Sequence, residues 1–273
     1  MRRMRLDSLN NIYKKIKPVF YTLIFEIRLN MKKVVVFFGV TILLLTFSSY
    51  LSIILRGYLP SSPVYFFDNG TIAFMIIIVL AVSLFFGGII CSESKNKTGL
   101  EILPLTNRYT LLIGKYLANL ILVIGIVVVY YLTMALFSYN FYGGPILYTL
   151  LYSFGFAVLY VFALSSIVTF LSSFMPSITP IIVIMSGYIL IWEGILSSII
   201  MGNVSELEPL YSLEYLFNIV RSIFNPEFST MERRNASTGR WLFPSIEGAL
   251  VFLSLYAIVF FILAALLFKR REF

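Results

Sequence analysis

Residues 93–115 read Glu-Ser-Lys-Asn-Lys-Thr-Gly-Leu-Glu-Ile-Leu-Pro-Leu-Thr-Asn-Arg-Tyr-Thr-Leu-Leu-Ile-Gly-Lys and form a charged island between two long apolar runs. Thr98 followed three residues later by Glu101 is a capping box, which predicts that a short helix begins at Thr98. Pro104 ends this helix, because the residue before a proline disfavours helical conformation. Thr106 can cap a second helix that continues into the next apolar run. We therefore expect a short helix held firmly between two apolar helices.

The composition places the rest of the chain in a bilayer. Hydrophobic residues make up 59% of the 273 residues and charged residues 12%, whereas soluble domains are nearer 45–50% apolar. The mean hydropathy is +0.92. The formal charge of +8 does not indicate nucleic-acid binding, because the basic residues lie where membrane topology would put them and form no aromatic-interleaved groove.

Residue types exclude several classes of chemistry. The one cysteine, Cys91, rules out an internal disulfide and a multi-cysteine metal site. The chain has no histidine, which rules out Ser-His triads, His-Glu-x-x-His zinc sites and imidazole proton relays. Gly114-Lys115 is followed by Tyr116 and does not complete a P-loop. We expect no catalytic residue, metal or cofactor in this chain, and any driving energy must come from another subunit.

The predicted fold is an all-α integral membrane domain of six spans over residues 34–273. About 20 apolar residues cross the roughly 30 Å of hydrocarbon. Pro176 and Pro180 favour a break between the fourth and fifth spans over one long helix. The runs of sufficient length are Val34–Leu55, Ile72–Cys91, Leu111–Phe137, Ile146–Phe170, Ile178–Met201 and Gly248–Phe268.

Residues 1–33 are predicted to be a separate interfacial helix. They carry nine basic side chains against only Asp7 and Glu26. Apolar residues recur at steps of three or four, so that lysines occupy the remaining helical face. Such a helix lies along anionic headgroups; the alternative is a simple positively charged anchor. The apolar positions are Ile12, Ile16, Phe20, Leu23, Ile27 and Met31.

The distribution of basic residues predicts the orientation. One side of the six-span arrangement receives sixteen Lys and Arg and the other five, which accounts for all 21. This difference puts both termini and residues 93–115 in the cytoplasm. The outer side then holds residues 57–71, a short connection at 138–145, and a long loop at 202–247.

The long outer loop contains a helical pattern. Residues 209–224 place apolar side chains at helical spacing, which predicts short helices that dip back toward the membrane; an amphipathic segment resting on the surface is the alternative. Residues 225–239 should form an exposed tip. Three Asn-x-Ser/Thr acceptors fall on this side, at Asn69, Asn203 and Asn235, and Asn235 is the best glycosylation candidate.

Glu193 is expected to be the only formal charge well inside a span. An ionisable group there needs a partner or a cavity. It could mark a polar point on a translocation path, or it could be a carboxyl group hydrogen-bonded to a neighbouring helix. Gly87-Gly88 and Ser165-Ser166 are expected to permit close packing of helices.

The charged island resembles the cytoplasmic coupling segment of the type-2 ABC exporter permeases. The resemblance implies that this segment docks into a groove of a separate ATP-binding subunit. Leu100, Ile102 and Leu103 would fill an apolar groove, while Glu101 and Arg108 make polar contacts. The residues that carry the likeness are, in order, Glu93, Thr98, Gly99, Leu100, Glu101, Leu103, Pro104, Thr106, Arg108, Gly114 and Lys115.

The resemblance implies a permease subunit of an ATP-driven exporter in the plasma membrane. Its partners would be two ATP-binding subunits, which hold ATP and Mg, a second permease subunit of the same or another kind, and membrane lipid. One alternative is an ATPase-coupled anchor or force transmitter for an outer-surface partner; another is a channel or carrier outside this family. An aromatic-rich interior suits lipid-linked, peptide or hydrophobic drug-like cargo, and it suits ordinary packing equally well.

Overall fold

The structure, a computed structural model, describes residues 2–56, 62–91, 108–143, 148–189, 208–225, 228–229, 232–235 and 241–270. Within these ranges the regular secondary structure is helical, joined by turns and irregular residues, and an isolated bridge pairs Arg234 with Trp241. The all-α prediction is therefore confirmed for the described residues. The helices are α1 (Arg2–Arg56), α2 (Pro63–Phe86), α5 (Arg108–Tyr142), α6 (Thr149–Ser172), α7 (Ile178–Gly187), α9 (Leu213–Ser222) and α10 (Ile246–Arg270).

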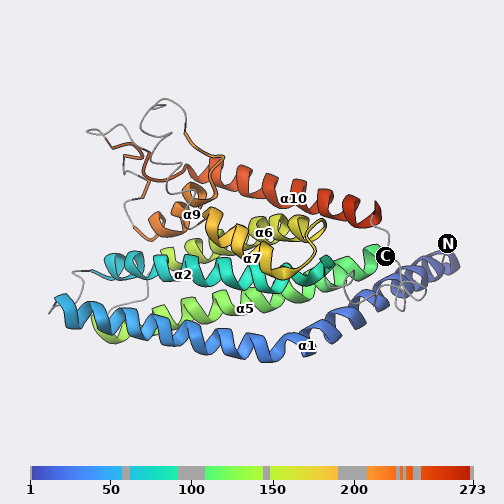
Figure 1. Cartoon of the computed structure of the whole chain (residues 1–273), viewed down its shortest axis with the longest axis horizontal. Coiled ribbons are helices and arrows are strands. Elements are labelled where there is room, and N and C mark those ends of the chain that lie inside the picture. Colours follow the sequence, from blue (N-terminus) through green and yellow to red (C-terminus); the bar gives the residue numbers. More distant parts are fainter. Residues whose placement is uncertain are drawn as a thin grey trace.

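Five of the described helices are long and apolar enough to cross a membrane, as a multi-pass membrane protein requires. They run roughly along one common direction in Figure 1. The predicted fifth span is described only in its first part, because α7 ends at Gly187 and residues 190–207 lie outside the described chain. The candidate spans are Lys17–Phe47, Phe66–Cys91, Tyr109–Tyr142, Thr149–Ser172 and Ile246–Arg270.

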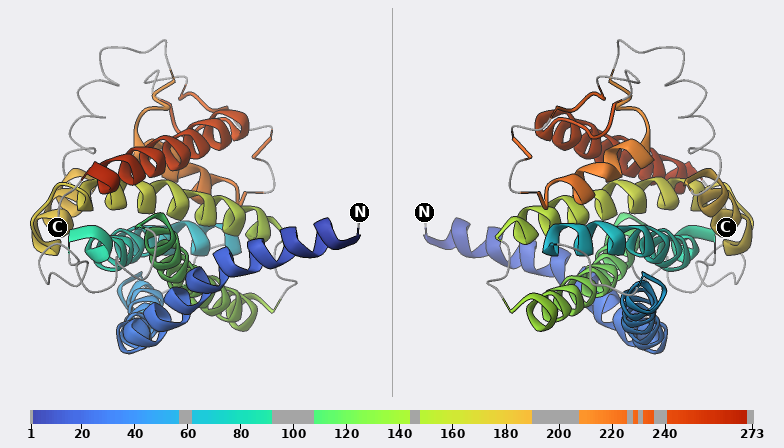
Figure 2. Two further views of the ribbon diagram at one scale, coloured as in Figure 1. Left: turned by 90° about the vertical axis from the view of Figure 1, so that its right-hand side faces the viewer. Right: turned by 90° about the vertical axis from the view of Figure 1, so that its left-hand side faces the viewer.

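Burial differs strongly between the spans. In the most apolar stretch of α2, 72% of residues are buried inside the chain, compared with 50% for α5 and for α6, 22% for α1 and 11% for α10. α1 packs mainly along α5, and α10 packs along α6. Figure 2 shows α10 and α1 on opposite flanks of the bundle. Thus α2 is the central helix, and α1 and α10 present most of their apolar surface outward.

The predicted division between residues 33 and 34 does not break the chain into two helices. α1 is one continuous helix of 55 residues, and its candidate span begins at Lys17 rather than Val34. Residues 19–38 contain neither glycine nor proline, so nothing interrupts helix propagation there. The N-terminal part of α1 nevertheless bends away from the bundle (Figures 1 and 2).

The prediction that residues 57–71 form an outer loop is wrong from Pro63 onward. Ser62 is extended (φ −149°, ψ 158°) and Pro63 occupies the first turn of α2, where its missing N–H costs nothing. Helix α2 therefore begins well before the predicted Ile72. Asn69 consequently lies within a helix rather than in a loop, although its side chain is exposed. Likewise, α5 extends to Tyr142, into the predicted connection at 138–145.

Aromatic rings join α2, α5 and α9 in the half of the bundle distant from the termini. Phe74 of α2 stacks on Tyr130 of α5 with ring centroids 4.1 Å apart. Phe67 of α2 stacks on Phe224, just beyond α9, at 5.0 Å. These rings are almost fully buried. The prediction of a helix within residues 209–224 is confirmed, and that helix is packed into the bundle.

Candidate functional site

Most of the predicted coupling site lies outside the described residues. The coupling residues outside the described chain are Glu93, Thr98, Gly99, Leu100, Glu101, Ile102, Leu103 and Pro104. The translocation-path candidate Glu193 and the glycosylation candidate Asn203 lie outside it too. Arg108 is placed as the first residue of α5. The structure does describe the two points that flank the segment, which are Cys91 at the end of α2 and Arg108 at the start of α5. The contacts at these two points form the candidate site.

Ser172 ties the end of α2 to the end of α6. Its hydroxyl donates to the carbonyl oxygen of Gly87 at 2.7 Å. It also accepts from the backbone N–H groups of Ile90 and Cys91, each at 3.1 Å. One hydroxyl has one donor and two acceptor sites, so these three bonds use its full capacity. Ser172 is completely buried. We call this group of hydrogen bonds the Ser172 junction.

The junction lies where α2 is interrupted. Regular helix ends at Phe86, and helical conformation resumes over residues 88–91 after a turn at Gly87. A Cβ atom at Gly88 would lie 3.1 Å from Cδ1 of Ile178 in α7, so the missing side chain lets α7 approach. The expectation that Gly87-Gly88 permits close packing agrees with this geometry. The Ser172 hydroxyl supplies hydrogen bonds at the place where the helix pattern is broken.

A polar cluster fixes the start of α5 against α1. Lys115 Nζ lies 3.0 Å from Glu26 Oε1. Asn30 Nδ2 donates to Asn119 Oδ1 at 3.2 Å and to Glu26 Oε2 at 3.4 Å. Lys33 Nζ donates to Asn30 Oδ1 at 2.9 Å. We call these five residues the α1–α5 polar clamp.

The centre of the clamp is buried in spite of its charges, whereas Lys33 is exposed. Glu26 and Asn30 are each 6% exposed and Asn119 is 3% exposed. Removing a carboxylate and an ammonium from water is costly unless both are paired and hydrogen-bonded, and the two asparagine amides complete that pairing. The clamp therefore holds α1 and α5 in one register, since sliding either helix would leave a buried charge unpaired.

Close backbone contact lies next to the clamp. A Cβ atom at Gly114 would be 2.8 Å from Cβ of Thr22 and 3.1 Å from the carbonyl oxygen of Val19. The absence of a side chain at Gly114 lets α5 approach α1 to this distance. Gly114 is followed directly by Lys115, so the same pair of residues provides both the close approach and the ion pair.

The clamp is a buried charge pair that the sequence analysis did not predict, whereas Glu193 lies outside the described residues. Glu26 and Lys115 both lie within candidate spans, and they pair with each other. From the sequence, Lys115 was assigned to the count of basic residues and to the family likeness, and Glu26 was noted only as one of two acids in residues 1–33. A usable signal was present, because Glu26 and Asn30, and Lys115 and Asn119, are each four residues apart and so share a helix face.

Tyrosine hydroxyl groups of α5 also bond to serines of α6. The Tyr116 hydroxyl lies 2.8 Å from Ser165 Oγ and 3.0 Å from Ser166 Oγ. The Tyr131 hydroxyl lies 2.7 Å from Ser153 Oγ. The Ser165-Ser166 pair was expected only to permit close packing, and the structure gives it a hydrogen-bonding partner as well.

Hydrogen bonds from α6 hold the C-terminal end of α9. Ser153 Oγ donates to the carbonyl oxygen of Val220 at 2.7 Å, and Thr149 Oγ1 donates to that of Phe224 at 3.0 Å. The last carbonyls of a helix lack partners within the helix, and these hydroxyls supply them. Because α9 also contacts α2 and α10, this helix packs against the bundle.

Ion pairs hold the polar end of the structure that lies distant from the termini. Arg221 makes two hydrogen bonds to the carboxylate of Asp68, one of them at 2.7 Å. Glu208 accepts from Arg233 Nη1 at 3.2 Å and from the backbone N–H of Ser245 at 2.9 Å. The hydrogen bond to Asp68 raises the pKa of Arg221, so this arginine stays charged at any physiological pH.

Two further side chains complete this end. The Tyr215 hydroxyl donates to Glu208 Oε1 at 3.2 Å. Burial, followed by the neighbouring Glu208 charge, raises the pKa of Tyr215, so that it remains a donor. Asn235 is half-buried beside the bridge of Arg234 with Trp241. The prediction that Asn235 is a glycosylation site on the outer side stays a prediction.

Comparison of the sequence with models of known protein families and with curated proteins gives no match. The five long apolar helices fit a multi-pass membrane protein. The family likeness rests on the residues of the 93–115 segment, together with the predicted span count and placement of the termini.

Proposed function

We propose that this chain is the membrane subunit of an ATP-driven exporter, and that residues 92–107 couple it to a separate ATP-binding subunit. The observation that carries the proposal is that both flanks of this segment are fixed in the bundle. The Ser172 junction holds Cys91 at one flank, and the α1–α5 polar clamp holds Lys115, two turns after Arg108, at the other. A segment anchored in this way transmits displacement to the spans, whereas a loosely attached connector would absorb it.

The described contacts supply a route for that displacement. Helix α2 runs from the neighbourhood of Asp68, which pairs with Arg221 of α9, to Cys91 at the Ser172 junction. At 1.5 Å per residue these ends are about 35 Å apart, which is enough to cross the hydrocarbon. A pull at Cys91 would thus reach α9 through α2 and the short helical continuation over residues 88–91 that the Ser172 junction holds. Coupling of this kind requires that both ends bias the same two-state element.

Six spans are the layout that fits these positions best. Helix α6 ends at Ser172, beside the end of α2. Glu208 belongs to the opposite end, where it contacts Ser245 just before α10. We propose that the chain between residues 172 and 208 crosses the bundle, with α7 (Ile178–Gly187) as the first part of that crossing. The two termini lie toward the same end of the molecule in Figure 1, as six crossings require.

The proposed assembly has two ATP-binding subunits, which hold ATP and Mg, and two permease subunits in the plasma membrane. The termini and residues 92–107 would face the cytoplasm. Exposed Phe20, Tyr21 and Phe25 on α1 alternate with Lys17 and Arg28, a pattern suited to the boundary between headgroups and hydrocarbon. This supports a role for the N-terminal part of α1 at the membrane surface.

The test is co-purification of the tagged full-length protein from its native membrane, followed by identification of bound proteins and an ATPase assay. We expect an ATP-binding subunit with the wild type, and its loss in the Glu101→Arg, Leu103→Asp double variant. The Asn96→Ser variant in the same segment should retain it. If no ATP-binding subunit is captured even after crosslinking, the coupling proposal is overturned.

The second candidate, an ATPase-coupled force transmitter, is favoured by the hydrogen bonds that join α9 to the bundle. These would carry motion to the outer loop without any transported substrate. An ATPase activity that rises with added hydrophobic cargo would support export. An activity that responds only to an outer-surface protein would support the force transmitter.

A further inference from the structure

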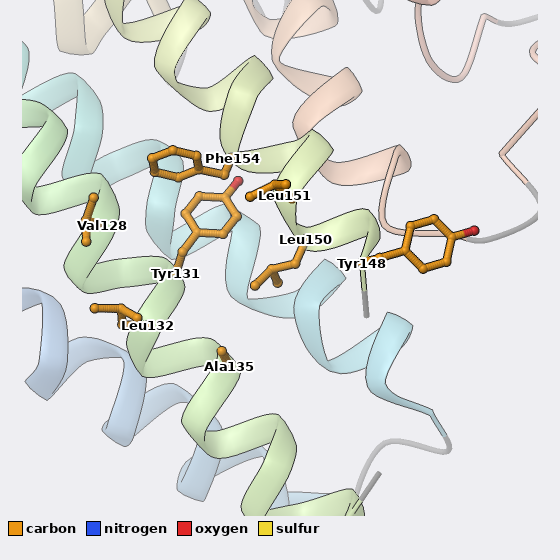
Figure 3. A pocket seen from close by; sticks show the side chains of 8 residues that line it. All are labelled: Val128, Tyr131, Leu132, Ala135, Tyr148, Leu150, Leu151 and Phe154. Atoms are coloured by element: carbon orange, nitrogen blue, oxygen red, sulfur yellow. The ribbon is translucent and has the colours of Figure 1, made fainter. Parts of the chain in front are cut away.

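An apolar groove lies between α5 and α6 in the half of the bundle distant from the termini (Figure 3). Its volume is about 400 Å³, which lies at the lower end of the range for sites that bind small molecules. The groove is lined by Val128, Tyr131, Leu132 and Ala135 of α5 and, among others, by Leu151 and Phe154 of α6.

The surface that lines the groove is almost entirely apolar. The Tyr131 hydroxyl is directed toward α6 (Figure 3) and is bonded to Ser153 Oγ at 2.7 Å. It is therefore engaged within the protein rather than offered to a ligand. A peptide or a headgroup placed here would lose its hydrogen bonds to water without replacement, which is unfavourable. The lining accordingly selects a hydrocarbon chain.

The position of the groove relative to the membrane points in the same direction. Val128 to Ala135 extend along about 10 Å of helix, which is less than one half of the roughly 30 Å hydrocarbon layer. Leu132 and Leu151, at the groove, are 59% and 75% exposed, so the groove opens on the surface that faces lipid. Tyr148 and Tyr152, at the beginning of α6, are exposed as well, and exposed tyrosines are typical of the headgroup level.

We propose that the α5–α6 groove binds one acyl chain of a phospholipid in the leaflet distant from the termini, with the glycerol end near Tyr148. The continuity of the groove with the lipid-facing surface, and its purely apolar lining, favour this occupant over a protein segment. The proposal depends on the membrane location of the chain and not on its coupling to an ATPase.

Occupation of the groove has a direct connection to α9. The bound chain would contact the ring of Tyr131, whose hydroxyl bonds to Ser153, and Ser153 in turn donates to the carbonyl oxygen of Val220. Lipid in the groove thus supports the side-chain arrangement that holds the C-terminal end of α9. Emptying the groove should loosen α9.

The experiment uses the full-length protein in lipid nanodiscs that contain phosphatidylcholine with a diazirine on its acyl chain. After photolysis, labelled peptides are mapped by mass spectrometry. We expect labelling concentrated in residues 128–135 and 148–154, above that of the exposed face of α10. Ala135→Trp should lower labelling of residues 148–154 about fivefold, because the indole fills the space of the chain. The matched control Leu136→Trp, on the neighbouring exposed position, should leave it unchanged.

A second groove-filling variant, Val128→Trp, keeps the test decisive if Ala135→Trp fails to fold. Equal labelling on the groove and on α10 would overturn the proposal, as would labelling that neither variant reduces. A crosslink at Leu132 to a second copy of the chain, or to another part of the same chain, would show that protein covers the groove and would overturn it too.

Discussion

At the scale of single residues, charge placement in the α1–α5 polar clamp gives the sharpest prediction. Lys115→Met should lower the free energy of unfolding by about 3–5 kcal/mol, because it leaves the buried Glu26 carboxylate without its cation. The double variant Glu26→Gln, Lys115→Met should recover most of this loss. Thermal unfolding in detergent measures both.

The control for the clamp is Lys32→Met, since Lys32 is an exposed lysine on α1, the helix that carries Glu26. It should change stability by less than about 0.5 kcal/mol. If Lys115→Met is as mild as this control, or if the double variant is worse than the single one, the clamp does not stabilise α1 against α5.

The Ser172 junction gives a second prediction at this scale. Ser172→Ala leaves the Ile90 and Cys91 N–H groups without the oxygen that now accepts from them, at a cost of about 1–3 kcal/mol. Hydrogen exchange of the peptide that contains residues 88–91 should become faster. Ser173→Ala is the control, because the Ser173 hydroxyl bonds within its own turn to Phe170. Equal exchange in the two variants would contradict the role given to Ser172.

At the scale of helices, the contact of α1 with α5 depends on a missing side chain. Gly114→Ala should destabilise the protein by about 1–3 kcal/mol, because the new methyl group would overlap Thr22 and the backbone of Val19. Gly155→Ala in α6, where nothing lies within 4 Å, should instead stabilise by about 0.5–1 kcal/mol. Unfolding curves that shift in the same direction for both variants would contradict this account.

Helix positions were predictable from the sequence where apolar runs are long and end at proline or polar residues. The sixth span and the break at Pro176 illustrate this. The predicted helix ends were wrong where aromatic residues continue a helix beyond its lipid-facing part, as at Phe66 and Phe67. Hydropathy alone does not show that such residues are buried against α9. The clamp was missed for a related reason: Glu26 and Lys115 are recognisable as partners only once α1 and α5 are known to pack together.

At the scale of the whole molecule, the proposed topology predicts which residues reagents can reach. In a Cys91→Ser background, Asn235→Cys should react with a membrane-impermeant maleimide in intact cells. Lys269→Cys, at the end of α10, should react only after the cells are opened. The charge asymmetry of the sequence carries this expectation. Labelling of both positions from the outside would contradict six crossings with cytoplasmic termini.

The two flanking contacts group four helices into two pairs, and the stacking of Phe74 on Tyr130 joins α2 of one pair to α5 of the other. The clamp joins α1 with α5, and the Ser172 junction joins α2 with α6, along which α10 packs. Between the pairs, Tyr116 and Tyr131 of α5 reach serines of α6. In sequence, residues 92–107 connect α2 of one pair to α5 of the other, so under the proposed coupling a force on them would act between the two pairs. The expected response is shear of one pair along the other, with the two tyrosine hydroxyls changing partners as the register shifts.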